Sequence, residues 1–465
     1  MKEKFYITTS IAYTNAPPHI GFALELIQAD VLARYHKNKN EDVFFLTGTD
    51  EHGAKIVKAA NAAGKDPQEF TDEISGKFRA LTKALNLSNN DFIRTTDRKR
   101  HWPNVKKVWS ELKKNGDIYK KEYEGLYCVG CEAFVKDKDL VDGLCPLHQQ
   151  KPELIKEENY FFRLSKYALE VKREIDEGRI RITPEVRKNE IISFINQGVE
   201  DVSCSRSKEN LQWGVPVPDD ESQIIYIWFE ALINYLLPKK YWPASVQCVG
   251  KDIFRFHALL WPSILLALSL PLPKTIFVHG YITANGQKMS KSLGNVVNPF
   301  EIVQKYGADP VRYFLLREIP ATEDGDFTEE KFKERYNGDL AGGFGNLVSR
   351  VSKLGHSLKV KKINDRKKLI TEYGDILLNS EEKYRSALEH FEFSASLAAI
   401  WSLIKFCDQE VEKNKLWQTS DRQKEIIGNL LFLIDEIAKL LEPFLPETSA
   451  RVLKKKVTGP LFPKI

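Results

Sequence analysis

Apolar residues near the start of the chain fall into short runs that alternate with segments of helical spacing. Residues 4–8 and 43–46 are β-rich runs that are typical of strands. Residues 23–37 and 51–63 carry apolar side chains at helical spacing, and Gly64 ends the second of these patterns. This strand-helix-strand-helix order predicts a parallel sheet covered by helices.

A second block of the same kind lies far downstream. Residues 246–249 and 275–278 are strand-like runs, and residues 252–268 between them have the spacing of a helix. Residues 116–225, which separate the two blocks, contain cysteines and differ in character. The simplest interpretation is one nucleotide-binding sheet that is split by an inserted domain.

The C-terminal part of the chain is expected to be helical. From about residue 328 onward strand signals nearly vanish. Residues 381–389, 394–413 and 422–441 form long amphipathic patterns, and prolines follow the last of them. These patterns predict an antiparallel helical bundle.

Size and composition point to a multidomain protein in a reducing compartment. A chain of 465 residues is too long for one ordinary core, and a net charge of +5 permits RNA as a partner, although solubility explains that charge equally well. The apolar stretch 264–272 is too short to span a membrane, and no apolar run follows Lys2 and Lys4 as a signal peptide requires. We therefore expect a cytoplasmic protein with no membrane partner. Its six cysteines are too few for a disulfide scaffold.

A histidine and a glycine stand where the first predicted helix begins, in the sequence Pro17-Pro18-His19-Ile20-Gly21. Free N–H groups at a helix N-terminus attract phosphate, and Gly21 would let a nucleotide approach the backbone closely. His19 could donate to phosphate oxygens as charge develops on them. Taken alone, such a pair is more often a structural cap than a catalytic site.

A lysine-rich loop with glycines on both sides lies further along the chain. Two lysines in such a loop can neutralise the charge on a departing pyrophosphate. A solvated basic loop is the alternative for a generic lysine-serine sequence. The loop is Lys288-Met289-Ser290-Lys291-Ser292, with Gly286 before it and Gly294 after it.

Three cysteines and a histidine have the spacing of a zinc site. Two short pairs separated by a loop suit tetrahedral Zn²⁺, and four filled positions indicate a closed, structural site. Free cysteines at chance spacing are the alternative, and Cys204, Cys248 and Cys407 are scattered in that way. The expected ligands are Cys128, Cys131, Cys145 and His148.

The histidine-glycine motif and the lysine loop together resemble the two signature sequences of class I aminoacyl-tRNA synthetases. Longer stretches are similar to the methionyl family: residues 44–53, 158–165, 249–253, 256–262 and 279–297. The resemblance implies ATP-dependent activation of L-methionine to methionyl-adenylate, with Mg²⁺ accompanying ATP, and transfer to the 3′ end of tRNA(Met). It also implies a Rossmann-type α/β catalytic domain (1–115 and 226–327), a zinc-binding connective insertion (116–225) and an α-helical anticodon-binding domain (328–465).

The resemblance also implies roles for individual residues. Asp50 matches the carboxylate that holds the substrate's ammonium group, and Gly250 and Asp252 match positions near the ribose of ATP. His19, Gly21, Lys288 and Lys291 match the catalytic positions, and with Met289, Ser290 and Ser292 they would bind the phosphates. The positions that match the methionine site are Ser10, Ile11, Tyr13, Trp228, Ala231, Tyr235, Phe256 and His257; plain core packing is the alternative for Trp228 and Tyr235.

Asn346 and Arg350 match the family's anticodon-reading pair and lie one turn apart on a predicted helix. An exposed polar helix face is the alternative. A tryptophan further along usually completes this site in the family, and no tryptophan follows Trp417, so the stacking residue is left unplaced.

The chain departs from the family in a few places. Phe22 stands where a second histidine is usual, which removes a donor near the phosphates. Ala12 replaces a common proline, and Glu230 replaces a common aspartate. No further RNA-binding, dimerising domain follows the bundle, so a monomer is expected.

The sequence argues against three other functions. Leucyl, isoleucyl and valyl enzymes need an editing domain, which about 110 residues cannot hold. Cysteinyl enzymes read their substrate with an open zinc site, whereas four filled positions predict a closed one. A non-catalytic RNA-binding paralogue that lost activity with Phe22 is disfavoured by the intact lysine loop and Asp50.

Overall fold

The computed structural model describes residues 2–128, 130, 133–135, 137, 140–146, 149–289, 294–455 and 459–465. The chain divides into two compact units, which we call the sheet unit and the helical unit. The sheet unit comprises Met1–Pro18, Asn40–Thr82 and Asn89–Val278, and the helical unit comprises His19–Lys39, Lys83–Ser88 and His279–Ile465.

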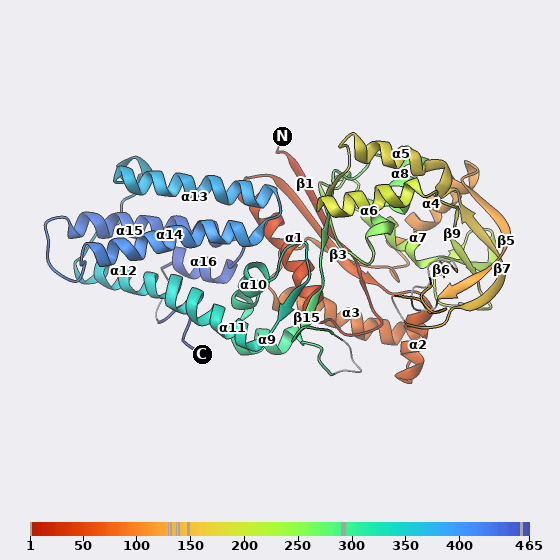
Figure 1. Ribbon diagram of the computed structural model, residues 1–465, viewed down its shortest axis with the longest axis horizontal. Helices are drawn as coiled ribbons and strands as arrows, with labels where there is room; N and C mark the ends of the chain where they lie inside the picture. The colour runs from red at the N-terminus through yellow and green to blue at the C-terminus, as the bar shows by residue number, and fades with distance from the viewer. Residues whose placement is uncertain are drawn as a thin grey trace. The chain divides into compact units, whose positions relative to one another are not determined.

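The sheet unit is built on a seven-stranded sheet in the order β2-β3-β1-β13-β14-β8, with β4 beside β3. β1 lies beside β3 and pairs with it in parallel (Figure 1). β1 also pairs in parallel with β13, and β14 pairs in parallel with β8. The predicted strands are all present as β1, β3, β13 and β14, so the predicted parallel α/β fold is confirmed. The bounds are β1 (Lys4–Thr9), β2 (Ala12–Tyr13), β3 (Asp42–Asp50), β4 (Asp91–Arg94), β8 (Arg181–Thr183), β13 (Val246–Gly250) and β14 (Thr275–His279).

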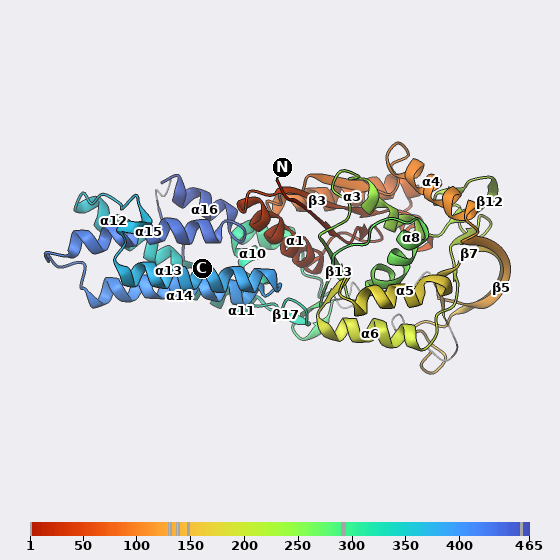
Figure 2. The same cartoon turned by 90° about the horizontal axis from the view of Figure 1, so that it is seen from above.

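The strand β8 was not predicted, and it comes from the cysteine-containing segment. Only three residues long, it carries too few positions to show a periodic pattern. The same segment forms its own antiparallel sheet, in the order β6-β5-β7-β9, and two helices, α5 and α6, which lie side by side in both views (Figures 1 and 2). The bounds are β5 (Ile118–Cys128), β6 (Ala133–Val135), β7 (Glu153–Phe162), β9 (Val202–Ser203), α5 (Leu164–Asp176) and α6 (Glu185–Asn196).

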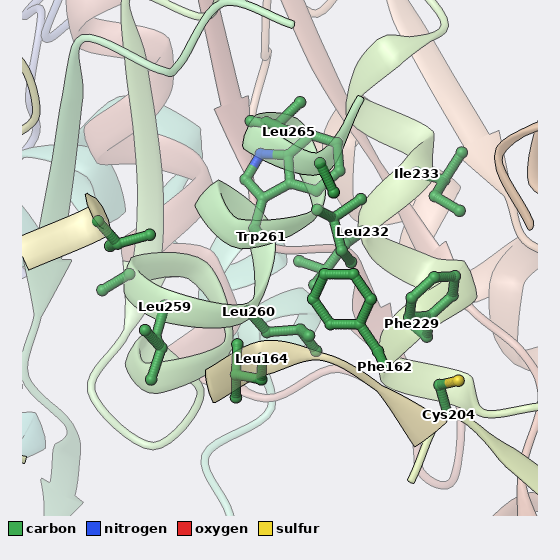
Figure 3. Close-up of a cluster of buried hydrophobic side chains, with 14 of the residues drawn as sticks. Phe162, Leu164, Cys204, Phe229, Leu232, Ile233, Leu259, Leu260, Trp261 and Leu265 are labelled. Carbon is green, nitrogen blue, oxygen red and sulfur yellow. The ribbon is translucent and has the colours of Figure 1, made fainter. Parts of the chain in front are cut away.

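One hydrophobic core joins this segment to the later part of the parallel sheet unit. Phe162 at the end of β7 packs with Phe229 of α7 (Ile227–Leu232), with ring centroids 6.0 Å apart. Trp261 of α8 (Trp261–Ala267) and Leu265 belong to the same cluster (Figure 3). The inserted segment therefore shares its core with the elements that follow it.

The predicted helix over residues 252–268 is interrupted. Its middle is a π-helical segment, η3 (Phe256–Leu260), and the α-helix α8 starts only at Trp261. Pro262 stands in the first turn of α8 and has no N–H for an intrahelical bond, which explains why the regular ladder cannot run through from the preceding turn. Such π-helical turns are frequent at functional sites.

Three further helices belong to the first part of the sheet unit. The predicted helix over residues 51–63 begins later, at Ala54, because Gly53 takes a φ of 108°, which a helix does not accommodate. The bounds are α2 (Ala54–Ala62), α3 (Pro67–Ala84) and α4 (His101–Lys114).

The helical unit contains the predicted bundle, and the three long amphipathic patterns are confirmed as α13, α14 and α15 (Figures 1 and 2). Within this unit α13 packs on α14, and α12 and α14 pack on α15. None of the described helices is long and apolar enough to cross a membrane. The bounds are α1 (Ile20–Asn38), α9 (Pro299–Tyr306), α10 (Ala308–Arg317), α11 (Glu329–Arg335), η5 (Tyr336–Gly345, π-helical), α12 (Asn346–Ser357), α13 (Thr371–Glu389), α14 (Phe393–Lys413), α15 (Gln423–Leu441) and α16 (Pro446–Leu453).

A buried ion pair ties α1 into the helical unit. Asp30 of α1 lies 2.7 Å from Arg312 of α10 and 2.8 Å from Arg34, and it accepts from the backbone N–H and the hydroxyl of Ser88. Burial alone would raise the pKa of the Asp30 carboxyl, but the two guanidinium groups outweigh it and hold the pKa below its usual value. A buried charge with this many partners is stable only while all of them stay in place.

Candidate active site

His19 is the cap of α1. Its backbone is extended, and its Nδ1 accepts from the Gly21 N–H at 3.1 Å. Burial lowers the pKa of the His19 imidazole, so the ring is neutral at physiological pH and Nε2 carries the hydrogen. This Nε2–H is the group that the sequence predicts as a hydrogen-bond donor to the phosphate oxygens. The first three backbone N–H groups of α1 are already used, since Ile20 donates to Val297, Gly21 to His19 Nδ1 and Phe22 to the His19 carbonyl, so the expected anion site at the free N–H groups of this helix start is not formed.

The glycine at position 21 is required by the histidine. A Cβ at this position would lie 2.8 Å from His19 Cε1 and 3.0 Å from its Nδ1, closer than non-bonded carbon atoms come. The side chain of Met289, the second residue of the lysine loop, lies 4.0 Å from the same point. The histidine-glycine motif and the start of the lysine loop thus meet within the helical unit.

Phe22 has a packing role that the sequence did not indicate. Its ring lies against the imidazole of His19, with centroids 4.6 Å apart. Phe22 stands where the family usually has a second histidine, so the sequence indicated only the loss of a hydrogen-bond donor. In the structure it instead supports the ring of the donor that remains.

Both ends of the lysine loop are held by backbone geometry. Upstream, β15 (Ile282–Ala284) and β16 (Gln287–Lys288) form a hairpin whose two-residue turn is Asn285-Gly286, with φ values of 53° and 73°. Downstream, Val297 accepts from the backbone N–H of Ile20 in the first turn of α1. Ser290, Lys291 and Ser292, and the side chain of Lys288, lie outside the described residues.

In the sheet unit, the residues expected at the amino-acid site follow strand ends. Ser10 comes directly after β1, Asp50 ends β3, and Gly250 ends β13. These three strands are parallel neighbours, so their carboxyl ends meet at one edge of the sheet. This edge is where open α/β sheets bind their ligands.

Tyr235 and His257 form the polar part of the expected methionine site. The Tyr235 hydroxyl lies 2.8 Å from His257 Nε2, and His257 Nδ1 lies 3.1 Å from the carbonyl of Ile253. A carbonyl accepts only, so Nδ1 carries the hydrogen and Nε2 accepts from the phenol. Burial lowers the pKa of His257 to about 4, which keeps the pair uncharged near neutral pH.

Trp228 and Phe256 form an aromatic wall. Their rings are stacked with centroids 4.2 Å apart and planes within 4° of each other, and both are partly exposed. Trp228 comes from α7 and Phe256 from η3, so the wall joins two elements. Ala231, also in α7, is buried.

Asp50 is 4% exposed, and the hydroxyl of Thr95 lies 3.4 Å from its Oδ1. Tyr13 of β2 pairs in register with Asp50, and Ile11 precedes that strand with a partly exposed side chain. A nearly buried carboxylate can hold an ammonium group, since neither charge is stable there alone. Asp252 follows β13 and is exposed.

Sequence reasoning missed a cluster of polar residues in the same unit. Glu230 of α7 accepts from His52 and from His101, and the three side chains are buried. The unusual glutamate was visible in the sequence, but its two partners were not.

Two of the four expected zinc ligands lie in the described part of the chain. Cys128 ends β5, Cys145 follows a tight turn at Asp142-Gly143, and both side chains are 1% exposed. Cys131 and His148 lie outside the described residues. Among the residues that are described, no group of three or more Cys, His, Asp or Glu side chains is arranged to hold a metal ion.

In the helical unit, Asn346 is the exposed first residue of α12, and Arg350 follows one turn later. Arg350 lies 2.6 Å from Glu412 of α14. Glu412 lines a cavity of about 510 Å³, as does Asp408, whose pKa is raised to about 6 by burial. Trp417 follows α14 and is 54% exposed.

Known proteins are similar to this chain over most of its length. A model of the family described as tRNA synthetases class I (M) matches residues 5–151 and 136–352. The methionine–tRNA ligase of Thermotoga maritima is 39% identical, with 97% of this chain and 75% of that protein covered. The methionine–tRNA ligase of Brucella suis is 38% identical, with 97% and 91% covered.

A solved structure agrees as well. Mycobacterium tuberculosis methionyl-tRNA synthetase in complex with methionyl-adenylate superposes with a TM-score of 0.90 at 35% identity, covering 97% of this chain and 93% of that one. Sequence identity, coverage and fold therefore agree, and the chain belongs to the methionyl (M) family of class I tRNA synthetases.

Proposed function

We propose that this chain is a methionine–tRNA ligase that uses ATP to attach L-methionine to tRNA(Met). The observation that best supports methionine as the amino acid is the uncharged Tyr235–His257 pair. A thioether is apolar and polarisable, packs well against aromatic rings such as those of Trp228 and Phe256, and needs no charged partner. A site for a charged side chain would need a buried counter-charge instead.

The reaction has two steps. The methionine carboxylate attacks the α-phosphorus of ATP, the bond to the bridging oxygen breaks, and pyrophosphate leaves. A terminal ribose hydroxyl of the tRNA then attacks the carbonyl carbon of methionyl-adenylate and releases AMP. Positioning and charge neutralisation supply most of the catalysis in such transfers.

Each group of site residues has a task in this scheme. Asp50 would hold the ammonium group, and Gly250 and Asp252 would contact the ribose. The His19 Nε2–H and the loop lysines would neutralise the phosphates, with Mg²⁺ accompanying ATP. The remaining methionine-site residues, which would line its side chain, are Ser10, Ile11, Tyr13 and Ala231.

A structural zinc ion is proposed for the cysteine-containing segment. Cys128, Cys131, Cys145 and His148 would hold it and leave no open position. The nearly complete burial of Cys128 and Cys145 supports this, because Asp142 and Gly143 beside Cys145 are exposed. The ion would fold the segment locally and would take no part in the reaction.

Anticodon recognition is proposed for the face of the helical unit that carries Asn346 and Arg350. The exposed indole of Trp417 follows the helix that holds Glu412, the partner of Arg350. Unpaired bases are bound by hydrogen bonds to their edges and by stacking on aromatic rings. We therefore assign the stacking residue that the sequence left unplaced to Trp417.

The four segments 1–115, 116–225, 226–327 and 328–465 are proposed as catalytic first half, connective insertion, catalytic second half and anticodon-binding domain. The protein is proposed to act as a cytoplasmic monomer.

Methionine-dependent ATP–pyrophosphate exchange tests the first step. We expect exchange with methionine and only background exchange with leucine, isoleucine, valine or cysteine. Exchange driven by one of those amino acids would assign a different substrate. Tight tRNA binding without any exchange would instead favour a non-catalytic RNA-binding protein.

A further inference from the structure

A carboxylate and two imidazoles form a hydrogen-bonded cluster inside the sheet unit. His52 Nδ1 lies 2.7 Å from Glu230 Oε1, and His101 Nε2 lies 2.7 Å from Glu230 Oε2. The three side chains are at most 2% exposed. None of them has a task in the proposed reaction, so the cluster requires its own explanation.

The cluster joins three segments that are far apart in the sequence. His52 stands two residues after Asp50, at the end of β3, and His101 is the first residue of α4. Glu230 lies in α7 between Trp228 and Ala231. Glu230 therefore links the segment that carries the expected ammonium-binding carboxylate to the helix that carries Trp228, one ring of the aromatic wall.

The helix α7 depends on such a link. It has only six residues and no side-chain cap, and an isolated helix of that length is not stable in water. Its orientation must come from tertiary contacts. Core packing of Phe229 and Leu232 supplies some of them, and Glu230 supplies two more from one fully buried side chain.

The hydrogen bonds fix the state of all three groups. Burial alone would raise the pKa of Glu230, but His52 and His101 outweigh it and hold the pKa below its usual value, so the carboxylate is ionised. It can only accept, so His52 Nδ1 and His101 Nε2 both carry hydrogen. Their outer atoms, His52 Nε2 and His101 Nδ1, have no hydrogen-bond partner among the described residues.

We propose that Glu230 is a positioning residue for the amino-acid substrate. Through His52 and His101 it sets the separation between Asp50 and the Trp228–Phe256 wall, and hence the length of side chain that fits between them. This inference rests on the proposed methionine-activating function. The extra methylene of Glu230, compared with the aspartate common in the family, matters here. A shorter side chain would set the carboxylate back by about 1.5 Å, one carbon–carbon bond, and could not keep both contacts unless α7 moved.

The inference predicts a selective change in the KM for methionine. Glu230→Ala removes both hydrogen bonds, and we expect the KM for methionine in ATP–pyrophosphate exchange to rise about tenfold or more, as loss of a buried charged acceptor implies. The KM for ATP should stay within about twofold. Discrimination against the shorter-chain amino acid homocysteine should weaken as well.

Conservative variants separate positioning from folding. In Glu230→Gln the amide oxygen still accepts from one histidine, whereas donation by the amide N–H to the other would move that ring's hydrogen to an outer nitrogen that has no acceptor among the described residues, so the KM for methionine should rise less than in Glu230→Ala. In His52→Asn and His101→Gln the amide nitrogen replaces the ring N–H that faces Glu230. Their KM for methionine should therefore lie closer to the parent value than the KM of His52→Ala and of His101→Ala. Glu230→Asp should raise the KM for methionine several-fold and serves as the test if Glu230→Ala does not fold.

A matched control is available in the helical unit. Glu410 is also a buried carboxylate, with Tyr373 and Asn414 as partners, and exchange needs no tRNA. Glu410→Ala should lower the melting temperature and leave the KM for methionine unchanged.

The outcomes are distinct. A parent enzyme without methionine-dependent exchange overturns the proposed function and this inference with it. Exchange in the parent, with folded Glu230 variants that keep the parent's KM for methionine, overturns the inference alone. So does an equal rise in the KM values for methionine and ATP, because that result indicates general loosening of the sheet unit. A rise confined to methionine, and smaller in Glu230→Gln than in Glu230→Ala, supports it.

Discussion

The phenol of Tyr235 donates a 2.8 Å hydrogen bond to Nε2 of His257, whose Nδ1–H is directed at the carbonyl of Ile253. The imidazole thus has both nitrogens occupied and no charge. In a protein that activates methionine, this pair would give the thioether a polar but neutral surface. The pair also makes the site sensitive to acid.

Protonation of His257 should reduce stability as the pH falls. Burial lowers its pKa to about 4, whereas the unfolded chain binds the proton near the ordinary value of about 6.5. The unfolded state therefore holds more protons between these two values, and stability is lost as the pH falls through this window. The loss should approach about 3 kcal/mol for this group. Urea unfolding at pH 7 and pH 4.5 should show a smaller difference for His257→Gln than for the parent; an equal difference would contradict the assignment.

Gly21→Ala should impair catalysis without unfolding the protein. The added Cβ would lie 2.8 Å from His19 Cε1 and would push the imidazole from its place at the start of α1. Displacing one donor to the phosphates should lower kcat for exchange by about 100-fold. The control is Gly76→Ala in α3, where a Cβ meets nothing within 4 Å and the helix gains up to about 1 kcal/mol. Equal activity in the two variants would remove His19 from the phosphate site.

Phe22 is expected to support His19. Phe22→Ala deletes the ring that packs against the imidazole at 4.6 Å, so His19 gains freedom and kcat for exchange should fall several-fold. The kcat of Phe22→Leu, which keeps apolar bulk at this position, should lie between those of the parent and of Phe22→Ala. Phe22→His tests the alternative: a parent without exchange and an active Phe22→His variant would mean that the natural chain is not catalytic.

The purified protein should contain about one zinc ion per chain, held by four ligands. Cys145→Ser should lower the zinc content measured by atomic absorption and destabilise the segment around it. Cys407→Ser is the matched control, because burial raises the pKa of that thiol and disfavours the thiolate that a metal needs. Unchanged zinc content in Cys145→Ser would place the metal elsewhere.

Trp417→Ala should affect charging of tRNA and leave amino-acid activation intact. The indole is 54% exposed, so it has less packing to lose than a core ring, and base stacking on an aromatic ring contributes about 1–3 kcal/mol. The KM for tRNA(Met) should therefore rise at least about fivefold, while exchange stays at the parent level. Tyr384→Phe is a suitable comparison, because its ring is buried inside the same unit against Tyr35 and Phe444. A normal KM for tRNA in Trp417→Ala would leave the anticodon without this stacking residue.

The apolar pattern predicted the elements that have a periodic buried face. β1, β13, β14 and the long helix α14 fall close to their predicted ranges, and β3 was found but runs four residues beyond its predicted end, because burial along a single element depends on local spacing. His19 and Gly21 could also be read from the sequence, since a cap and the helix it begins are neighbours in the chain. The lysine loop and the cysteine spacing could likewise be recognised in the sequence, because each lies within a short stretch of the chain.

Only the tertiary structure decided which distant residues meet. Glu230 is 178 positions from His52 and 129 from His101, and nothing local distinguishes these histidines from others. Phe22 looked like a lost donor until its ring was seen against His19. The sequence by itself thus determined the elements, the motifs and the family, because each depends on neighbouring residues. The packing of the sheet and of α7 decided the buried contacts, because a hydrogen bond between remote side chains exists only after the fold brings their segments together.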